Sequence, residues 1–319
     1  MKIKPRPDLK PNEWKDPSKG SGHKLFGLAD DFLAGHDELA GAEFFVAGQQ
    51  VGTKGGTFRA WDIHRKLIGE DLFTEAQETG DCVAVASGDL IEALQLIEIA
   101  SGEAEEFHPV FAPYLYAAGR VAIGENRLRG GAGSIGTWQA KAVAKYGALR
   151  ADMEGVPKYS GGLADSWGDD RSAGGSKWQD WIDYADDHTI RKWAYIKNWD
   201  ELVAAITNGH LCTMASNLGF DMTAGRDGFH RQRGSWAHQM GIWAICDDPK
   251  NRWVGIHNNW GDVHGRLKDF ETGEDWPVGM IRSKPEGISS AFRNGEIIAW
   301  SGFNGFIDRR KEWLKWSLA

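Results

Sequence analysis

The feature that most constrains the fold is a long apolar stretch that begins at Cys82. It reads CVAVASGDLIEALQLIEIA over residues 82–100. Its apolar side chains recur at the 3.6-residue period of an α-helix. The residues of this stripe are Val83, Ala86, Leu90, Ala93, Leu94 and Ile97. Glu92 and Glu98 point away from the stripe, and Gly102 is a suitable stop. A helix this apolar needs burial, so we expect it at the centre of the fold.

The residues before this helix place a thiol at its first turn. The stretch QETGDCVAVA puts a Gly-Asp bend directly in front of Cys82, and Thr79 or Asp81 can cap the helix. Unpaired N–H groups and the helix dipole favour a thiolate at such a position. Cys82 could therefore be a nucleophile, although a cysteine at this place could also be core filler, a metal ligand or half of a disulfide.

Composition excludes several classes of function. The chain has 319 residues and a formal net charge of −8, without a basic block long enough to bind nucleic acid. No run approaches the roughly 20 apolar residues of a membrane span, and the polar, proline-punctuated start has no signal-peptide core. Three cysteines are too few for a disulfide framework. We therefore expect a cytoplasmic or otherwise non-secreted protein without a membrane partner.

The order of the expected elements indicates an α+β protein. Helical patterns gather in the first half of the chain and period-two strands in the second. We expect an N-terminal arm or extension over residues 1–70, which could also contact a larger protein assembly. A helical subdomain with a Gly/Trp-rich insertion follows over 71–190, and a β-rich subdomain with a C-terminal tail over 191–319. Residues 42–63 predict two strands joined at Gly52–Gly56.

Tryptophan is unusually abundant, with 16 residues beside 41 glycines. Many of them lie between Trp167 and Trp199, and we expect the tryptophan-rich segment, residues 151–190, to be mostly irregular. Large flat side chains suit the packing of irregular backbone, and we favour this interpretation over an aromatic surface for a ligand.

A predicted hairpin between His238 and Asn258 brings two polar side chains together. Its turn, CDDPKN, contains the residue types that form turns. If the hairpin is centred on Asp248, paired residue numbers sum to 496, and His238 lies opposite Asn258 with Cβ atoms roughly 5 Å apart. A slip of one residue would point them at opposite faces. An imidazole held by a carboxamide is half of an arrangement that activates a nucleophile.

These residues, in this order, resemble the papain-like cysteine peptidases. The motifs are Gln77 and Cys82 before a long apolar helix, His238 at the beginning of a strand, and NNWG at Asn258–Gly261. The paired glycines Gly130 and Gly131 precede a helix that ends in KYG, as the substrate-cleft loop of the family does. The match covers about residues 70–310.

The resemblance implies a fold and a set of roles. The fold is a helical left subdomain, with its central helix starting at the cysteine, packed on an antiparallel β-barrel-like right subdomain. Cys82 would be the nucleophile and His238 the acid and base. Asn258 would orient the histidine, and Gln77 would donate a hydrogen bond to the oxyanion. The substrate would be a peptide or protein, and the family's chemistry needs no cofactor or metal.

Two further roles follow from the same resemblance. Trp260 would cover the hydrogen bond between His238 and Asn258. Gly130 and Gly131 would let the backbone of the substrate approach closely.

The sequence also departs from the family pattern. Gln77 lies five residues before Cys82, where the family usually has six, and Val83 replaces a common aromatic residue. No inhibitory propeptide of the family type is recognisable in residues 1–70. Two alternatives to a peptidase therefore stay open. One is a papain-fold protein with little or no turnover that serves as a structural or binding component of an assembly, and the other is a cell-wall amide hydrolase.

The remaining candidates have plainer interpretations. Cys212 and Cys246 lie in apolar strands and are expected to be core thiols. His257 and His264 could suggest a metal, but they belong to no compact set of ligands, so no metal site is expected. Asn259 competes with Asn258 for the orienting role, and the hairpin pairing favours Asn258.

Overall fold

A computed structural model describes most of the chain, over residues 56–72, 74, 76–100, 106–128, 132–169, 177–190 and 192–301. The expected N-terminal arm and the C-terminal tail lie outside this part, apart from the end of the arm. The first strand expected within residues 42–63 lies outside it as well, and so do Gly130 and Gly131.

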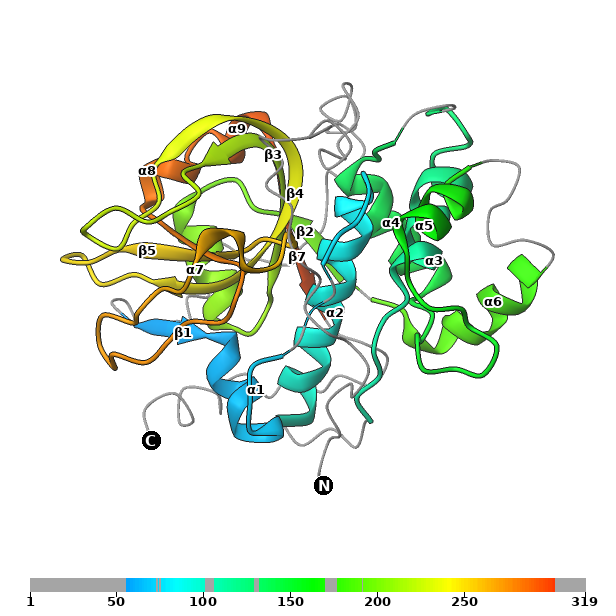
Figure 1. Ribbon diagram of the computed structural model, residues 1–319, viewed down its shortest axis with the longest axis horizontal. Helices are drawn as coiled ribbons and strands as arrows, with labels where there is room; N and C mark the ends of the chain where they lie inside the picture. The colour runs from blue at the N-terminus through cyan, green and yellow to red at the C-terminus, as the bar shows by residue number, and fades with distance from the viewer. Residues whose placement is uncertain are drawn as a thin grey trace.

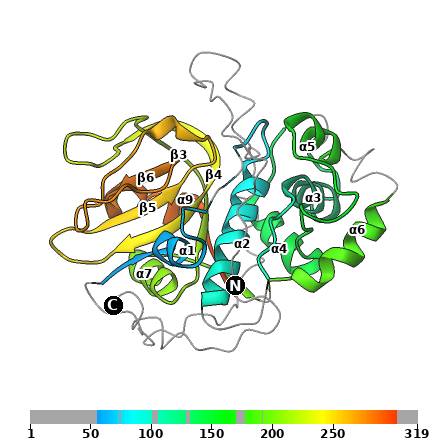
Figure 2. The same ribbon diagram turned by 60° about the horizontal axis from the view of Figure 1, so that its bottom comes forward.

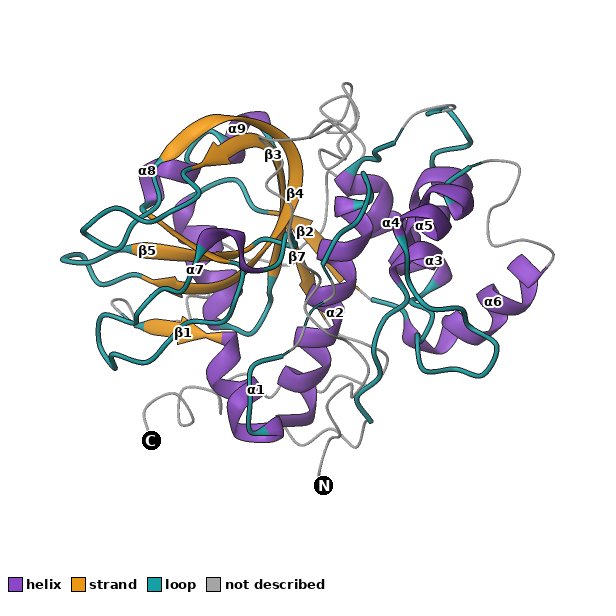
Figure 3. Ribbon diagram, in the orientation of Figure 1, coloured by secondary structure: helices purple, strands orange, loops and turns teal. Residues whose placement is uncertain are grey.

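One side of the molecule is helical, and the other contains the sheet together with shorter helices, in agreement with the predicted α+β class (Figure 1; Figure 3). Helix α2 lies between the sheet and the other helices of the helical half (Figure 2). The elements of this half are α2 (Cys82–Ala100), α3 (Ala112–Ala117), the π-helix η4 (Ala118–Ile123), α4 (Gly136–Tyr146), α5 (Gly161–Trp167), α6 (Trp178–Ala185) and the 3-10 turn η6 (Asp186–His188).

The other half is built on an antiparallel sheet. Within the described residues it has seven strands, in the order β2-β7-β3-β4-β5-β6, with β1 paired to β4. The strands are β1 (Thr57–Arg59), β2 (Lys192–Tyr195), β3 (Cys212–Phe220), β4 (Gln232–Cys246), β5 (Trp253–His257), β6 (Met280–Ser283) and β7 (Glu296–Ser301). The helices of this half are α1 (Ala60–Ile68), α7 (Trp199–Thr207), η7 (Asp262–His264), α8 (Pro285–Ile288) and α9 (Ala291–Asn294).

Helix α2 is central, as its apolar sequence predicted. Every residue from Cys82 to Glu98 is buried, so Glu92 and Glu98 do not point to solvent. The carboxylate of Glu92 instead accepts the backbone N–H of Val110 at 2.7 Å. The backbone N–H of His108 in the same way reaches the side chain of Gln95 at 2.8 Å. Buried polar groups need such partners, because they have lost their hydrogen bonds to water.

The long helix α2 raises the question of membrane insertion. None of the helices in the described ranges is both long enough and apolar enough to cross a bilayer.

The tryptophan-rich segment is more regular than the sequence predicted. It contains α5 and α6, where we expected irregular backbone. Trp167 is buried and packs edge-on against Phe111, with ring centroids 5.2 Å apart, and Trp181 is also buried. These two side chains therefore pack in the core, in agreement with the interpretation that the tryptophans fill space between backbone segments.

Strand β1 differs from the prediction, which extended a strand to Ile63. It is only three residues long, it pairs with Ala244–Cys246 of β4, and helix α1 begins at Ala60. Helix α1 then has Trp61 and His64 on its buried face. A short strand is sufficient here because side chains, in addition to the backbone ladder, link this segment to the sheet.

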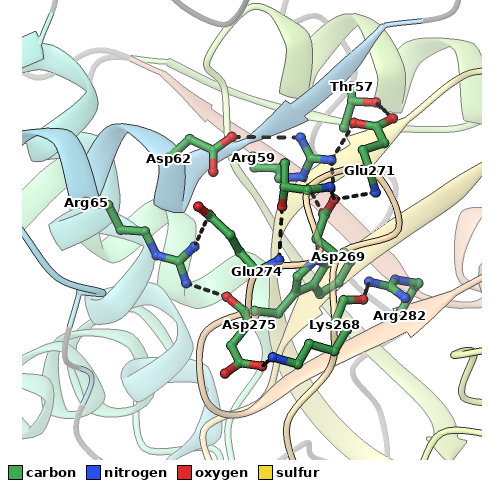
Figure 4. A network of polar contacts seen from close by, with 12 residues as sticks. Thr57, Arg59, Asp62, Arg65, Lys268, Asp269, Glu271, Glu274, Asp275 and Arg282 are labelled. Atoms are coloured by element: carbon green, nitrogen blue, oxygen red, sulfur yellow. Dashed lines mark hydrogen bonds and ion pairs between the residues drawn. The ribbon is translucent and has the colours of Figure 1, made fainter.

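Arg59 provides most of that link (Figure 4). Its guanidinium donates to Asp269 at 2.8 and 3.1 Å and to Glu271 at 2.7 Å. The indole N–H of Trp276 donates to Asp269 at 2.9 Å. Burial would raise the pKa of Asp269, but the hydrogen bond from Trp276, two backbone N–H groups and the charge of Arg59 hold that pKa below its usual value.

We predict that Arg59→Gln destabilises the protein by about 3 kcal/mol, because it leaves the nearly buried carboxylate of Asp269 without its cation. Denaturant unfolding measures this change. The matched control is Arg231→Gln, which removes an ion pair whose two side chains are 58% and 43% exposed, and it should have little effect. Equal effects of the two substitutions would contradict the prediction.

Candidate active site

Cys82 is the first residue of helix α2, at the point where the chain turns into the helix. The backbone carbonyl of Asp81 accepts the N–H groups of Ala84 and Val85 at 2.8 and 3.1 Å. The Thr79 hydroxyl, a predicted cap, donates to Asp165 instead at 2.6 Å. The Cys82 side chain is fully buried, and the backbone N–H of Gln239 points at its Sγ at 3.4 Å.

His238 directly precedes Gln239, whose N–H contacts the thiol, on strand β4. Its Nε2 lies 2.9 Å from Oδ1 of Asn258, and its Nδ1 has no hydrogen-bond partner within the described part of the chain. Burial lowers the pKa of His238 to about 4, while the hydrogen bond that its Nε2 donates to Oδ1 of Asn258 acts in the opposite direction. The ring is therefore neutral at pH 7 unless a negative charge forms beside it.

The hairpin register differs from the prediction, although His238 and Asn258 do meet. Paired residue numbers sum to 498 at Gly241 and His257 and to 499 nearer the turn, not to 496. An irregularity between Ile242 and Ala244 shifts the register of β4 by one residue. Strand β5 ends at His257, so Asn258 lies beyond the ladder and reaches His238 from the following turn.

Trp260 packs against the His238 ring. The two ring centroids are 4.6 Å apart at 32°, and Trp260 is fully buried. Its indole N–H donates to Oε1 of Gln77 at 3.2 Å. An indole N–H can only donate, so this contact fixes which end of the Gln77 amide faces Trp260.

Gln77 is held from two sides in the loop before Cys82. Its backbone N–H donates to the carbonyl of Asn259 at 2.8 Å, and its amide NH2 donates to the carbonyl of Thr79 at 2.5 Å. On the other side, the Tyr159 hydroxyl donates to the carboxylate of Asp81 and accepts the N–H of Glu78, each at 3.0 Å. The short loop is thus anchored on both halves of the molecule.

The structure therefore brings Gln77, Cys82, His238, Asn258 and Trp260 to one place, at the start of α2. Gly130 and Gly131 lie outside the described residues, and their role stays a prediction.

The other two cysteines lie in β3 and β4 and are buried. Burial raises the pKa of the Cys212 thiol, which makes it a poor nucleophile. Among the residues that the structure describes, no three His, Cys, Asp or Glu side chains are arranged to hold a metal ion.

Solved structures of similar shape are cysteine proteases. Xylellain, a cysteine protease from Xylella fastidiosa, is 14% identical with a TM-score of 0.54, over 81% of this chain and 90% of its own. Digestive procathepsin L 3 from Tenebrio molitor is 10% identical with a TM-score of 0.51, over 90% of this chain and 79% of its own. ProCathepsin B S9 from Trypanosoma congolense is 10% identical with a TM-score of 0.51, over 81% of each chain.

The chain has the papain-like fold. At this level of identity the likeness concerns the fold alone. No protein-family model matches the sequence, and no curated protein is similar to it.

Two contacts beside the site in this papain-like fold were not predicted from the sequence. The amide of Asn259 donates to the carboxylate of Asp89, and this bond holds the turn after β5 against helix α2. Asp89 lies seven residues after Cys82, on the same face of the helix two turns on, and an acidic residue in so apolar a helix was a usable signal. His264 contacts Asn258, but nothing in the spacing of these two residues indicated it.

Within the described residues, five of the buried histidines have a lowered pKa and are neutral at pH 7. Burial lowers the pKa of each from its ordinary value of 6.5, to about 3 or about 4. They are His64, His230, His238, His257 and His264. The unfolded chain then binds more protons than the folded chain below pH 6.5, so stability falls as the pH is lowered from there toward the folded pKa values.

We predict a steep loss of stability in mild acid, with each buried histidine costing about 2 kcal/mol at pH 5. Thermal melting between pH 7 and pH 5 measures it. The variant His64→Phe removes one of these groups, which packs edge-on against Trp243, and should flatten the pH dependence. A melting temperature that stays constant over this range would contradict the prediction.

Proposed function

We propose that the protein is a papain-like cysteine peptidase that cleaves a peptide or isopeptide bond in a peptide or protein substrate. The observation that carries this proposal is the pairing of His238 Nε2 with Asn258 Oδ1 at 2.9 Å, on the strand whose Gln239 N–H points at the Cys82 thiol. That pairing commits one ring nitrogen to Asn258 and leaves Nδ1 as the nitrogen for the proton of the thiol.

The first step is the transfer of the thiol proton to Nδ1 of His238. Burial disfavours an imidazolium on its own, so the ring gains its proton only as the thiolate forms beside it. The thiolate at the start of α2 is stabilised by the helix N-terminus and by the N–H of Gln239 at 3.4 Å. Neither charge would be stable here without the other.

The thiolate then attacks the carbonyl carbon of the substrate. Negative charge develops on the carbonyl oxygen, and the backbone N–H of Cys82 together with the NH2 group of Gln77 would stabilise it. The Trp260 indole supports this role because it occupies the oxygen end of the Gln77 amide. The Asn259 carbonyl accepts a hydrogen bond from the Gln77 N–H, and this contact holds the loop beside the site.

Three proton transfers complete the reaction. His238 returns its proton to the leaving amine as the C–N bond breaks and a thioester forms on Cys82. Water then attacks the thioester while His238 takes a proton from it. The C–S bond breaks, the carboxylic acid is released, and the proton on His238 passes to the Cys82 sulfur. Asn258 holds the ring in one orientation through both steps.

One observation favours a second candidate, a papain-fold protein with little or no turnover that acts as a binding component. The side chains of both Cys82 and His238 are fully buried. A substrate can reach Sγ only after covering groups move, whereas a binding protein needs no such movement.

The test is hydrolysis of unfolded casein and of peptidoglycan fragments by the full chain and by Cys82→Ala and His238→Ala. We expect peptide cleavage that falls at least about 10³-fold in both variants, because the cysteine and the histidine act as one unit. Alkylation with iodoacetamide at pH 6, read by mass spectrometry, should label Cys82 before Cys212 and Cys246.

Two outcomes would contradict the peptidase. If casein stays intact and Cys82 reacts no faster than the two strand cysteines, the binding component is favoured. If only peptidoglycan fragments are cleaved, the site is that of a cell-wall amide hydrolase.

We predict that Gln77→Glu lowers kcat about 10²-fold with little change in KM, because the carboxylate lacks the NH2 donor to the oxyanion. This substitution keeps an oxygen to accept the Trp260 N–H but loses the NH2 donor to the Thr79 carbonyl. Gln77→Ala, which removes both contacts, should lose at least as much. A wild-type kcat for Gln77→Glu would exclude the oxyanion role.

A further inference from the structure

Asn258 has a second partner beyond the catalytic histidine. Its Nδ2 lies 2.8 Å from Nε2 of His264, while its Oδ1 lies 2.9 Å from His238. All three side chains are buried, with exposed fractions of 2% or less. His264 ends the short helix η7 that follows the NNWG turn, where Gly261 adopts a positive φ of 67° and the chain folds back.

His238, Asn258 and His264 form a row of hydrogen-bonded side chains. Only one placement of the hydrogen atoms in this row is compatible with the proposed catalysis. When His238 carries the proton of the thiol, both of its ring nitrogens are donors, so Asn258 must present its oxygen to it. The NH2 group of Asn258 then faces His264, and only an acceptor is tolerated there. His264 satisfies this condition when its Nε2 carries the lone pair and its Nδ1 the hydrogen.

The surroundings of His264 keep it neutral, as this arrangement requires. Burial lowers its pKa to about 3, and the nearby His230 acts in the same direction, while the backbone of Asp221 and Met222 acts against it. The His230 ring stands edge-on at 5.6 Å, and Trp236 packs at 6.1 Å. An imidazolium at this position would place a second donor against the Asn258 NH2 group.

We propose that His264 is a positioning residue that holds the Asn258 amide in one orientation and thereby selects the His238 tautomer whose Nδ1 is open to the thiol proton. The catalytic importance of this assignment rests on the proposed peptidase function. The hydrogen bonds between His238, Asn258 and His264 do not depend on whether the protein cleaves a substrate. The tautomer of His264 fixes the orientation of the Asn258 amide, and that orientation in turn fixes the tautomer of His238.

Two substitutions separate the hydrogen bond from packing. His264→Phe keeps a flat ring against His230 and Trp236 but removes the acceptor. His264→Gln can place Oε1 near the position of the ring Nε2 and so restores an acceptor. The control is His64→Phe, which removes a different buried imidazole that packs on Trp243.

The first measurement is the 15N NMR spectrum of the histidine side chains, with the His238 signals assigned through their loss in His238→Ala. We expect wild-type His238 to carry its hydrogen on Nε2 in the neutral ring, and His264→Gln and His64→Phe to keep it there. In His264→Phe the two tautomers should mix. A His238 ring that stays protonated on Nε2 alone in His264→Phe would overturn the proposal.

The second measurement is the rate of Cys82 alkylation by iodoacetamide between pH 5.5 and pH 8. His264→Phe should react about tenfold more slowly at pH 6 than wild type, because the Asn258 amide has lost its buried partner, and His264→Gln should recover most of the rate. Equal rates for wild type and His264→Phe would count against the assignment. If wild type cleaves no peptide while the tautomers change as expected, the peptidase proposal fails and the positioning of Asn258 stands.

Discussion

Burial of helix α2 on every side is the constraint on which the rest of the structure depends. A helix inside a protein cannot leave a polar side chain without a partner, so the few polar residues on α2 determine what packs around it. Ser87 receives the side chain of Gln239 from β4, and Asp89 receives Asn259 from the turn after β5. These bonds join the strand of His238 and the turn of Asn258 to the helix of Cys82. The same contacts that stabilise the core thus align the site.

The site is also buried, and its two histidines, His238 and His264, are neutral. His238 and His264 are both buried and uncharged, and an amide lies between them. In such surroundings a charge is costly unless its partner is adjacent, so the proposed mechanism requires the charges on Cys82 and His238 to form together. Precise orientation of hydrogen-bonding groups replaces solvation in this region.

The sequence predicted the fold class and the central helix because apolar periodicity is a local property that burial enforces. It also identified the two residues that meet at the hairpin, His238 and Asn258, but with the wrong register. The irregularity near Trp243 is a product of how β4 packs, and no residue type marked it. Asp89 left a readable signal as an acid in an apolar helix. The contact between His264 and Asn258 did not, because it depends on how the chain folds back after Gly261.

The position of strand β7 in the sheet has a consequence for folding during synthesis. Glu296–Ser301 is inserted between β2 and β3, so one edge of β3 stays unpaired until more than two hundred residues after Cys82 have been made. Strand β3 in turn supports β4, which carries His238. Pairing over such sequence distances is slow, and an incomplete sheet holds its strands loosely. A ribosome-bound chain that lacks this strand would therefore contain Cys82 before the strand of His238 is held in its final place.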